Sequence, residues 1–374
     1  MQKKKGVALF YDPHNLYQFI WYYCTYGKDV EWTAVCLPNA QKGEYVSKYC
    51  EKTGIFSRII SDQQGFLTMS LRERLAFFLK MVGYAIVGKQ EKYCRQLVER
   101  NISCNDFEVA VVLTDVGIIS GAYVGLGKTK DIVILEDGYG DYAYRGNDYL
   151  KKHLLNINDW QGFLLAKMGY SNPAHYYPLK TTKYCDKFCS KPEKMLYRDY
   201  RSMKKLFDFS NTDKVLFDEI LGRIYHEILE IDFETSEVIL FTDPLKDYVQ
   251  DDTEYVEKVQ EYVKKNYKNI LLKKHPRDDT HYDFGENVNV IEIDSSIPAE
   301  AFLDKLGNKE ILFIGMSSIL LYLDAESQKI TYLYFKGMQQ QCEKEKSFLK
   351  YGSKKKMRSD MCKFGGEKAT IVEV

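Results

Sequence analysis

Residues 270–277 read Ile-Leu-Leu-Lys-Lys-His-Pro-Arg, so a short apolar run passes directly into a basic turn. Continuous branched apolar residues are typical of strands buried in a parallel sheet. Ligands of open α/β sheets bind just beyond the carboxyl ends of such strands. Pro276 fixes the backbone and keeps His275 out of a helix. The stretch therefore predicts a buried parallel strand that ends with His275 at the ligand-binding edge of its sheet.

Similar apolar runs alternate with helical patterns along the chain, which indicates α/β architecture. The first series of predicted strands comprises residues 6–11, 33–37, 56–60, 108–113 and 132–135. The second series comprises residues 238–241, 270–272, 288–291, 311–314 and 330–333. Long helices are predicted at 71–100 and 253–267, and short ones begin near Pro298 and Met316. Two such series predict two Rossmann-like domains that face each other across a cleft.

The length of the chain also favours two domains, because 374 residues exceed the usual size of one hydrophobic core. We expect an N-terminal Rossmann-like domain at 1–230 with a helical insertion, a C-terminal one at 231–350, and a basic tail at 351–374. Residues 140–230 are rich in tyrosine and are expected to be mostly helical, with a loop at 170–193.

The overall composition excludes several classes of protein. The 53 Lys and Arg residues equal the 53 Asp and Glu residues, so net charge gives no reason to expect nucleic-acid binding. Nine cysteines without a paired framework favour free thiols in a reducing compartment. The apolar run at 6–10 is too short for a signal peptide, and no stretch is long enough to cross a bilayer. We therefore expect a cytoplasmic protein.

One segment, residues 344–363, is locally basic and contains Lys354, Lys355, Lys356 and Arg358. It fits a solvated helix and tail. It also fits peripheral attraction to the anionic inner face of the plasma membrane. Both interpretations stay open.

The basic turn at 274–277 has the chemistry of an anion site. A histidine at this position can donate a hydrogen bond or a proton to a phosphate, and Lys274 or Arg277 can add positive charge. The alternative is a turn histidine before a proline, surrounded by solvated basic residues.

An acidic motif, Glu136-Asp137-Gly138, follows the predicted strand at 132–135. Two adjacent carboxylates can supply a general base, because their mutual repulsion raises the pKa of one of them, and the glycine permits a tight turn. The alternative is an acidic turn without a catalytic role, since Asp-Gly is a common turn signal.

Two more motifs lie at predicted helix starts in the second half. In Gly315-Met316-Ser317-Ser318, the N–H groups and hydroxyls at the helix start can bind an anion. The alternative is that a serine simply caps the helix. In Ile297-Pro298-Ala299-Glu300, the carboxylate of Glu300 can bind the two hydroxyls of a ribose, or simply stabilise the helix N-terminus.

The order of these motifs resembles that of bacterial sialyltransferases. The acidic-acidic-glycine, His-Pro and paired-serine motifs are similar to those of the lipooligosaccharide sialyltransferases (glycosyltransferase family 52) and of the bacterial polysialyltransferases. The first family is the better match in length and in the Ile-Pro-Ala-Glu segment. The resemblance implies a GT-B-type fold and an inverting, metal-independent reaction, without a cofactor, that uses CMP-sialic acid. It also implies a glycan acceptor of a capsule or lipooligosaccharide, ending in galactose, and for some relatives a homodimer.

The resemblance also implies roles for single residues. His275 would assist the departing CMP phosphate, which Ser317 and Ser318 would bind. Glu300 would hold the ribose, with Pro298 near the cytosine. Lys274 or Arg277 would bind the donor's carboxylate.

The general base has two possible sources. The acidic motif supplies Glu136 or Asp137, whereas a variant among lipooligosaccharide sialyltransferases implies Asp251 or Asp252, upstream of the His-Pro motif. Asp252 also fits a helix capping box, Asp251-Asp252-Thr253-Glu254. His14, after the first predicted strand, either lines the acceptor side or is a satisfied loop histidine.

Two other functions are compatible with the same motifs. One is a transferase that uses another CMP-linked acidic sugar, such as CMP-Kdo. The other is a non-catalytic protein that binds a nucleotide or a glycan during assembly of a surface polysaccharide.

Overall fold

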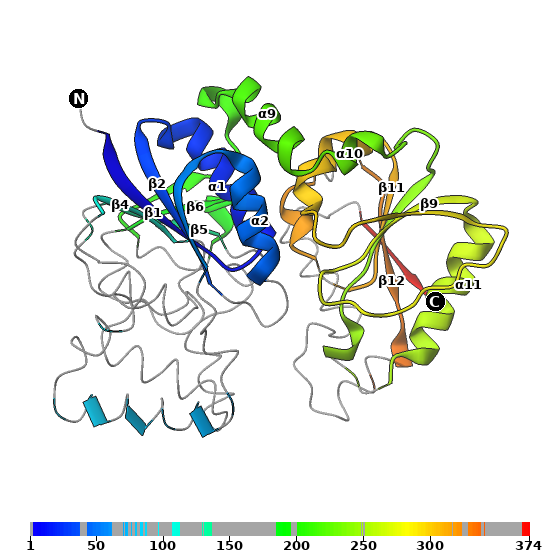
Figure 1. Cartoon of the computed structure of the whole chain (residues 1–374). Helices are drawn as coiled ribbons and strands as arrows, with labels where there is room; N and C mark the ends of the chain where they lie inside the picture. The colour runs from blue at the N-terminus through cyan, green and yellow to red at the C-terminus, as the bar shows by residue number, and fades with distance from the viewer. Residues whose placement is uncertain are drawn as a thin grey trace. The chain divides into compact units, whose positions relative to one another are not determined.

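The computed structural model divides the chain into two compact units, Met1–Ile224 and Tyr225–Val374. Each unit is built around a β-sheet (Figure 1). The structure describes residues 3–37, 43–61, 107–112, 129, 131–136, 185–195, 200–247, 249, 251–315, 317–323, 328–337, 340 and 369–374, with single residues and pairs between 70 and 96.

A seven-stranded parallel sheet forms the centre of the first unit, in the order β3-β2-β1-β4-β5-β6-β7. Its strands are β1 (Lys4–Phe10), β2 (Val30–Cys36), β3 (Phe56–Ser61), β4 (Val109–Val112), β5 (Asp131–Leu135), β6 (Cys185–Cys189) and β7 (Ser202–Lys205). The first six strands follow the Rossmann order 3-2-1-4-5-6, which places a topological switch point between β1 and β4. Gly6 of β1 is required there, because a Cβ atom would lie 2.6 Å from the ring of Trp32 on β2.

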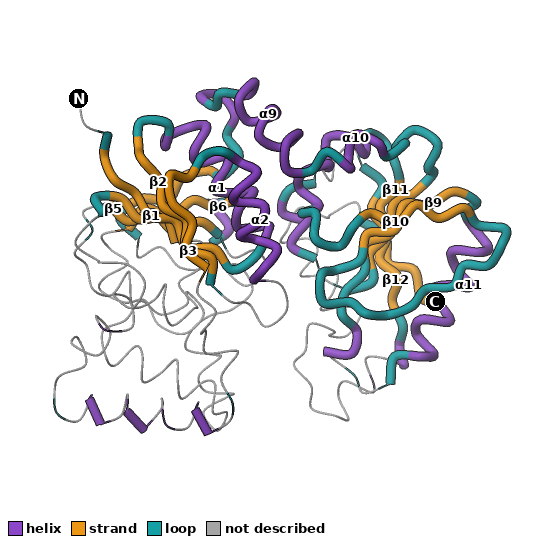
Figure 2. The backbone as a smooth tube through the Cα atoms, viewed as in Figure 1, coloured by secondary structure: helices purple, strands orange, loops and turns teal. Residues whose placement is uncertain are grey.

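Within the described residues, the helices of the first unit are α1 (Pro13–Tyr22), the π-helical turn η1 (Tyr23–Gly27), α2 (Gly43–Thr53), the 3₁₀ turns η4 (Pro192–Lys194) and η5 (Phe209–Asn211), and α9 (Lys214–Ile224). Helices α1 and α2 lie beside the sheet, and α9 contacts α1 and α2 (Figure 2). Buried aromatic rings join α1 to the strands: Phe19 packs edge-on against Phe10 at 5.3 Å and against Trp32 at 5.0 Å. Such contacts bury large apolar areas and hold α1 on the sheet.

The second unit contains a six-stranded parallel sheet in the order β10-β9-β8-β11-β12-β13. Its elements are α10 (Glu227–Glu230), β8 (Val238–Phe241), η6 (Leu245–Asp247), α11 (Thr253–Asn266), β9 (Asn269–Lys273), β10 (Asn289–Ile293), η7 (Ala299–Leu306), β11 (Glu310–Phe313), η8 (Ser318–Leu321), β12 (Ile330–Tyr334) and β13 (Thr370–Glu373). This order is again 3-2-1-4-5-6. The switch point lies between β8 and β11, so ligands are expected at their carboxyl ends.

Helix α11 supplies one wall of the second core. Its apolar residues Val256, Val259 and Val263 recur at helical spacing and pack with the apolar side chains of β8 and β9. Tyr255 is buried beside them, and its hydroxyl donates to the carbonyl of Leu333 at 2.5 Å. The predicted helix at 253–267 and all ten predicted strands are therefore present, with small shifts at their ends.

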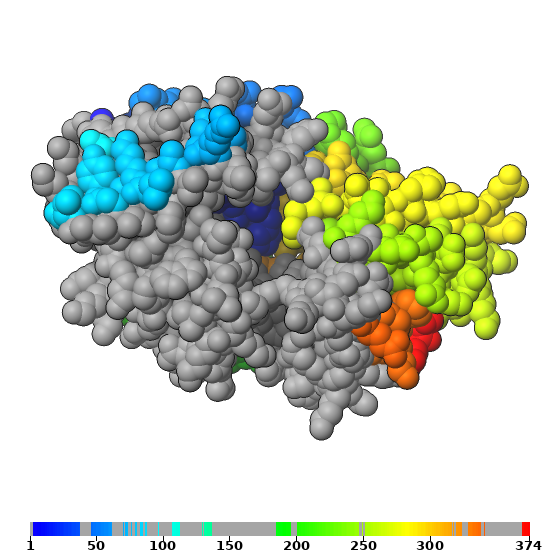
Figure 3. Space-filling model, turned by 90° about the horizontal axis from the view of Figure 1, so that it is seen from below, coloured from blue at the N-terminus to red at the C-terminus, as the bar shows by residue number. Residues whose placement is uncertain are grey.

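The prediction of two Rossmann-like α/β domains, the architecture of the GT-B class, is confirmed. The division falls between Ile224 and Tyr225 rather than after residue 230. Residues 370–373, expected in the basic tail, form β13 beside β12. Figure 3 shows the C-terminal residues (red) beside orange residues of the same unit. The rest of the predicted tail at 351–368, the basic segment 344–363 and most of the helix at 71–100 lie outside the described residues.

The predicted loop at 170–193 is wrong over its last part, since residues 185–189 form the fully buried strand β6. Its sequence, Cys-Asp-Lys-Phe-Cys, does not read as a buried strand, because it contains two charged residues. Both are buried and make polar contacts with other parts of the unit. Asp186 accepts a hydrogen bond from Arg201 at 2.7 Å, and Lys187 donates to the carbonyl of Leu135 at 3.0 Å. No helix within the described part of the chain is long and apolar enough to cross a membrane.

Candidate active site

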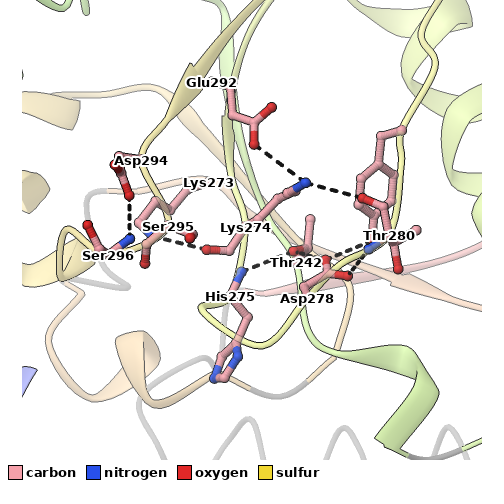
Figure 4. A network of polar contacts seen from close by, with 11 residues as sticks. Thr242, Lys273, Lys274, His275, Asp278, Thr280, Glu292, Asp294, Ser295 and Ser296 are labelled. Atoms are coloured by element: carbon pink, nitrogen blue, oxygen red, sulfur yellow. Dashed lines mark hydrogen bonds and ion pairs between the residues drawn. The ribbon is translucent and has the colours of Figure 1, made fainter. Parts of the chain in front are cut away.

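His275 stands at the carboxyl end of β9, next to the switch point of the second sheet. Its backbone makes two hydrogen bonds, and Figure 4 shows the one to Thr242. Its backbone N–H donates to the hydroxyl of Thr242 at 3.2 Å, and its carbonyl accepts from the N–H of Asp278 at 2.8 Å. The second bond closes a four-residue turn with Pro276 at the position that proline favours.

The imidazole of His275 is half-buried and has a defined orientation. The backbone N–H of Arg277 donates to its Nδ1 at 3.1 Å. An acceptor at Nδ1 requires the neutral ring to carry its proton on Nε2. In Figure 4 the ring points away from the polar network above it. The turn thus presents Nε2–H as a hydrogen-bond donor.

A buried carboxylate, Asp278, lies beneath this turn. One of its oxygens accepts from the hydroxyl of Thr242 and, at 3.2 Å, from that of Tyr282; the other accepts from the N–H of Thr280 at 3.0 Å. Burial, followed by the negative charge of Asp278, raises the pKa of Tyr282 far above its usual range. Tyr282 therefore stays a hydrogen-bond donor, as a buried carboxylate requires.

The two lysines before His275 point to different partners. Lys274 donates to the carbonyl of Thr280 at 3.3 Å and pairs with Glu292 of β10 at 3.5 Å. Lys273, only 4% exposed, donates to the carbonyls of Lys274 and Ser295, each at 3.0 Å. Successive side chains of extended backbone point to opposite faces. Lys274 accordingly lies away from the His275 ring in Figure 4, whereas Lys273 links the β9 and β10 loops.

Of the other predicted donor-binding residues in this turn, Pro276 and Arg277 are both exposed. Pro298 is buried and stands at the N-terminus of η7, with Glu300 half-buried in its first turn. The loop before Pro298 is shaped by Asp294, whose carboxylate accepts from the N–H of Ser296 at 2.7 Å.

The paired-serine motif lies at the carboxyl end of β11, on the other side of the switch point. Gly315 has φ of 99°, which only glycine adopts without strain, so the chain turns sharply there. Ser317 caps the short helix η8, since its hydroxyl accepts from the N–H of Ile319 at 3.3 Å. Ser318 is the first residue of η8.

Asp252 belongs to the same unit as His275 and is buried, with 9% exposure. Its side chain makes no capping bond to α11; the hydroxyl of Thr280 donates to it at 3.4 Å. The neighbouring Asp251 instead accepts from the N–H of Thr253 at 3.0 Å. The capping role expected of Asp252 is therefore performed by Asp251.

Glu136 follows β5 in the first unit and is fully buried. Both of its oxygens accept from Ser190, which follows the neighbouring strand β6: one from the N–H at 2.7 Å, the other from the hydroxyl. Ser190 itself is half-buried. Asp137 lies outside the described residues.

His14 lies in the first turn of α1 rather than in a loop, because Asp12 caps that helix and Pro13 occupies its first position. Its Nε2 contacts the side-chain amide of Gln18 at 2.9 Å, one helical turn away. His14 follows β1, the strand at the switch point of the first sheet.

The matching protein family bears directly on these residues. A family model described as alpha-2,8-polysialyltransferase matches residues 100–335. This span is more than half of the chain and contains Glu136, His275, Glu300 and Ser317. The chain belongs to the alpha-2,8-polysialyltransferase family.

Membership of this family confirms the predicted resemblance to sialyltransferases. Of the two families that the motifs resemble, the matching model names the polysialyltransferases. Closer kinship with the lipooligosaccharide sialyltransferases stays a prediction. His14 lies outside the matched span.

Several solved structures are similar to the chain at low identity. They include the glycosyltransferase SnogD from Streptomyces nogalater (TM-score 0.49, 13% identity, 100% of this chain and 87% of that one). A sialyltransferase from Photobacterium damsela has a TM-score of 0.49 and 10% identity over 100% of this chain and 82% of that one. UDP-GlcNAc 2-epimerase from Neisseria meningitidis has a TM-score of 0.48 and 12% identity, over 99% and 95%. At these scores the likenesses carry no argument about function. No curated protein sequence matches the chain.

Sequence reasoning missed four residues that hold the candidate motifs in place: Thr242, Lys273, Asp278 and Ser190. Thr242 could have been found, because it follows β8, the strand at the switch point. Ser190 could not, since β6 itself went unrecognised. Within the described residues, no group of three or more His, Cys, Asp or Glu side chains is arranged to hold a metal ion.

Proposed function

We propose that this chain transfers sialic acid from CMP-sialic acid to a terminal sugar of a bacterial surface glycan, with inversion and without a metal ion. The observation that carries the proposal is the family match over residues 100–335, which includes the His275 turn at the carboxyl end of β9. The name of the family favours terminal sialic acid as the acceptor, and the motifs are also compatible with terminal galactose.

His275 acts on the leaving group. The acceptor oxygen attacks the anomeric carbon, the bond to the phosphate oxygen breaks, and CMP leaves with the electron pair. Negative charge grows on the phosphate, and a preorganised donor lowers the barrier by binding that charge. The second pKa of a phosphate monoester is about 6, so CMP needs a hydrogen bond rather than full protonation. Nε2–H of His275 can supply this bond while Arg277 N–H holds Nδ1.

The carboxyl ends of β11 and β10 supply the remaining donor contacts. The phosphate would meet Ser317 and Ser318 after the tight turn at Gly315. Glu300 would bind the ribose hydroxyls, with Pro298 beside the cytosine. Arg277 is the better placed of the two basic residues for the donor's carboxylate, since the ammonium of Lys274 is engaged by Glu292.

The general base accepts the proton of the acceptor hydroxyl. Glu136, Asp137 and Asp252 remain the candidates. Among the two described carboxylates we favour Glu136, because a positioned partner, Ser190, orients it. The half-buried hydroxyl of Ser190 can pass the acceptor proton on to the buried carboxylate.

The test is incubation of the full chain with CMP-sialic acid and glycans that end in galactose or in α2,8-linked sialic acid. CMP release and the mass of the product are measured, and a reaction without acceptor corrects for hydrolysis. We expect acceptor-dependent CMP release and addition of sialic acid. Turnover of CMP-Kdo alone would identify another CMP-sugar transferase, and CMP binding without turnover of either donor would identify a non-catalytic protein.

A further inference from the structure

Both ends of the His275 turn are tied to one hydroxyl group. Thr242 Oγ1 accepts the N–H of His275 at 3.2 Å and donates to the carboxylate of Asp278. Asp278 in turn donates its N–H to the carbonyl of His275 at 2.8 Å. The three residues therefore form a closed ring of hydrogen bonds, with the Thr242 hydroxyl at the point where it closes (Figure 4).

The chemistry of these groups leaves little freedom in this arrangement. The backbone N–H of His275 can only donate, so the hydroxyl oxygen of Thr242 must accept from it. The single proton of that hydroxyl is then donated to the carboxylate of Asp278. Thr242 and Asp278 are 6% and 7% exposed, so water does not compete strongly for these bonds. Burial also makes an incomplete ring costly, because an unsatisfied buried polar group loses its hydration without compensation.

The ring is anchored to the sheet on two sides. Thr242 follows β8, and its N–H donates to the carbonyl of Lys273 at the end of β9 at 3.1 Å. Asp278 is held by Thr280 N–H and by the hydroxyl of Tyr282. Tyr282 and Phe284 stack at 6.1 Å and belong to the core beneath α11. The position of the His275 backbone is thus set by the core of the unit rather than by the loop alone.

We propose that Thr242 is a positioning residue that acts through His275, with Asp278 orienting its hydroxyl, so that Nε2–H points at the leaving phosphate. The inference rests on the proposed function and adds two residues to its machinery. A reacting group must be held within a fraction of an ångström, and a misplacement of about 1 Å can cost about 100-fold in rate. Loss of the Thr242 hydroxyl removes the acceptor of the His275 N–H and one of the donors to Asp278 at the same time.

The test compares Thr242→Val, which keeps the shape and removes the hydroxyl, with Thr242→Ser, which keeps the hydroxyl. We expect Thr242→Val to lower kcat about 10- to 100-fold with little change in KM for CMP-sialic acid. Thr242→Ser should restore most of the rate. Thr235→Val is the matched control, because Thr235 is exposed in the same unit, and it should leave the rate unchanged.

A double-mutant cycle separates positioning from a general structural role. If Thr242 acts through His275, Thr242→Val should change kcat by less than about twofold when His275 is already alanine. Equal losses in both backgrounds would overturn the proposal. Should Thr242→Val fail to fold, Asp278→Asn replaces it in the cycle, since asparagine has one acceptor oxygen and cannot serve both the hydroxyls of Thr242 and Tyr282 and the N–H of Thr280.

A spectroscopic readout keeps the inference independent of the proposed function. The chain has six histidines, and in ¹⁵N-histidine-labelled protein the signals of His275 are those that disappear in His275→Ala. We expect the wild type to show the form with the proton on Nε2, and folded Thr242→Val to show a mixture of tautomers. Unchanged His275 signals in folded Thr242→Val would overturn the proposal, even if the wild type transferred no sialic acid. Absence of transfer with the expected signals would contradict the proposed function alone.

Discussion

Lys274 and Glu292 form an ion pair between the end of β9 and the neighbouring strand β10, with Nζ 3.5 Å from Oε1. This contact turns Lys274 away from the His275 ring (Figure 4). The buried ammonium at this edge belongs to Lys273, whose acceptors lie in the loops that lead to His275 and Pro298. A donor-binding role was predicted for Lys274 from the sequence. In the structure Lys273, one position earlier, connects the loop that leads to His275 with the loop that leads to Pro298.

This difference predicts opposite outcomes for the two lysines. Lys274→Gln should change kcat/KM by less than about threefold, because a partly exposed ion pair contributes little. Lys273→Met should lower kcat/KM at least about tenfold and destabilise the fold by about 1–3 kcal/mol, because it leaves buried carbonyls without a donor. Lys273→Arg, which keeps the charge, should retain more activity than Lys273→Met. Steady-state kinetics and thermal unfolding of the variants check this, and a larger loss for Lys274→Gln would restore its donor-binding role.

The identity of the base is tested by three substitutions. We expect Glu136→Gln to abolish transfer, because the glutamine amide cannot accept the acceptor proton that Ser190 passes on. Ser190→Ala should lower kcat about tenfold by freeing the orientation of Glu136. Asp252→Asn should keep most of the activity. If Asp252→Asn were inactive yet as stable as the wild type, and Glu136→Gln were active, the base would lie in the second unit.

The stability of the first unit should depend on pH through Asp186. The hydrogen bond from Arg201, with further help from Ser202 and Lys204, lowers the pKa of Asp186 to about 2. Because the pKa of Asp186 is lower in the folded state, its ionised carboxylate stabilises the fold at pH values above 3.8, its pKa in the unfolded chain. This stabilisation is lost as the pH falls from 3.8 toward 2. We expect Asp186→Asn to cost about 1–2 kcal/mol at pH 7, and the difference from wild type to shrink below pH 3.8.

Thermal unfolding of wild type and Asp186→Asn between pH 7 and pH 3 measures this dependence. Asp218→Asn is the control, because the pair of Asp218 with Lys214 is exposed on α9 and should contribute little. A destabilisation by Asp186→Asn that did not change with pH would contradict the electrostatic origin.

Metal removal should leave transfer intact. Hydrogen-bond donors, rather than a cation, are proposed to stabilise the departing phosphate. We expect the initial rate of CMP release to change by less than about twofold after dialysis against EDTA. Loss of the rate, with recovery on adding Mg²⁺ or Mn²⁺, would show that a metal shares this role.

The alternation of apolar runs and helices predicted most of the fold because strands such as β8 and β11 are buried on both faces and read as continuous apolar sequence. Three strands were not predicted from the sequence, each for a physical reason. Strand β6 carries charges whose partners lie far away in sequence, and the edge strands β7 and β13 are short and partly exposed. No local pattern distinguishes such segments from loops.

Several residues of the candidate site were predictable because they lie within two residues of a strand's carboxyl end. His275, Glu136 and Gly315 were found in this way, since the carboxyl edge of a parallel sheet is a general binding position. The contacts of Thr242 with Asp278 and of Ser190 with Glu136 join residues 36 and 54 positions apart. Such partners become neighbours only through the pairing of strands, which one sequence does not specify.

The central claim is that Nε2–H of His275 binds the departing phosphate, and the rates of three His275 variants test it most directly. The side-chain amide of glutamine reaches the position of Nε2, whereas that of asparagine reaches only the position of Nδ1. His281→Gln is the matched control, because His281 is exposed in the same loop. With CMP-sialic acid and a saturating acceptor, we predict that His275→Gln keeps a measurable part of kcat, while His275→Asn and His275→Ala lose at least about 100-fold. Wild-type rates in His275→Ala, or higher activity of His275→Asn than of His275→Gln, would contradict the claim.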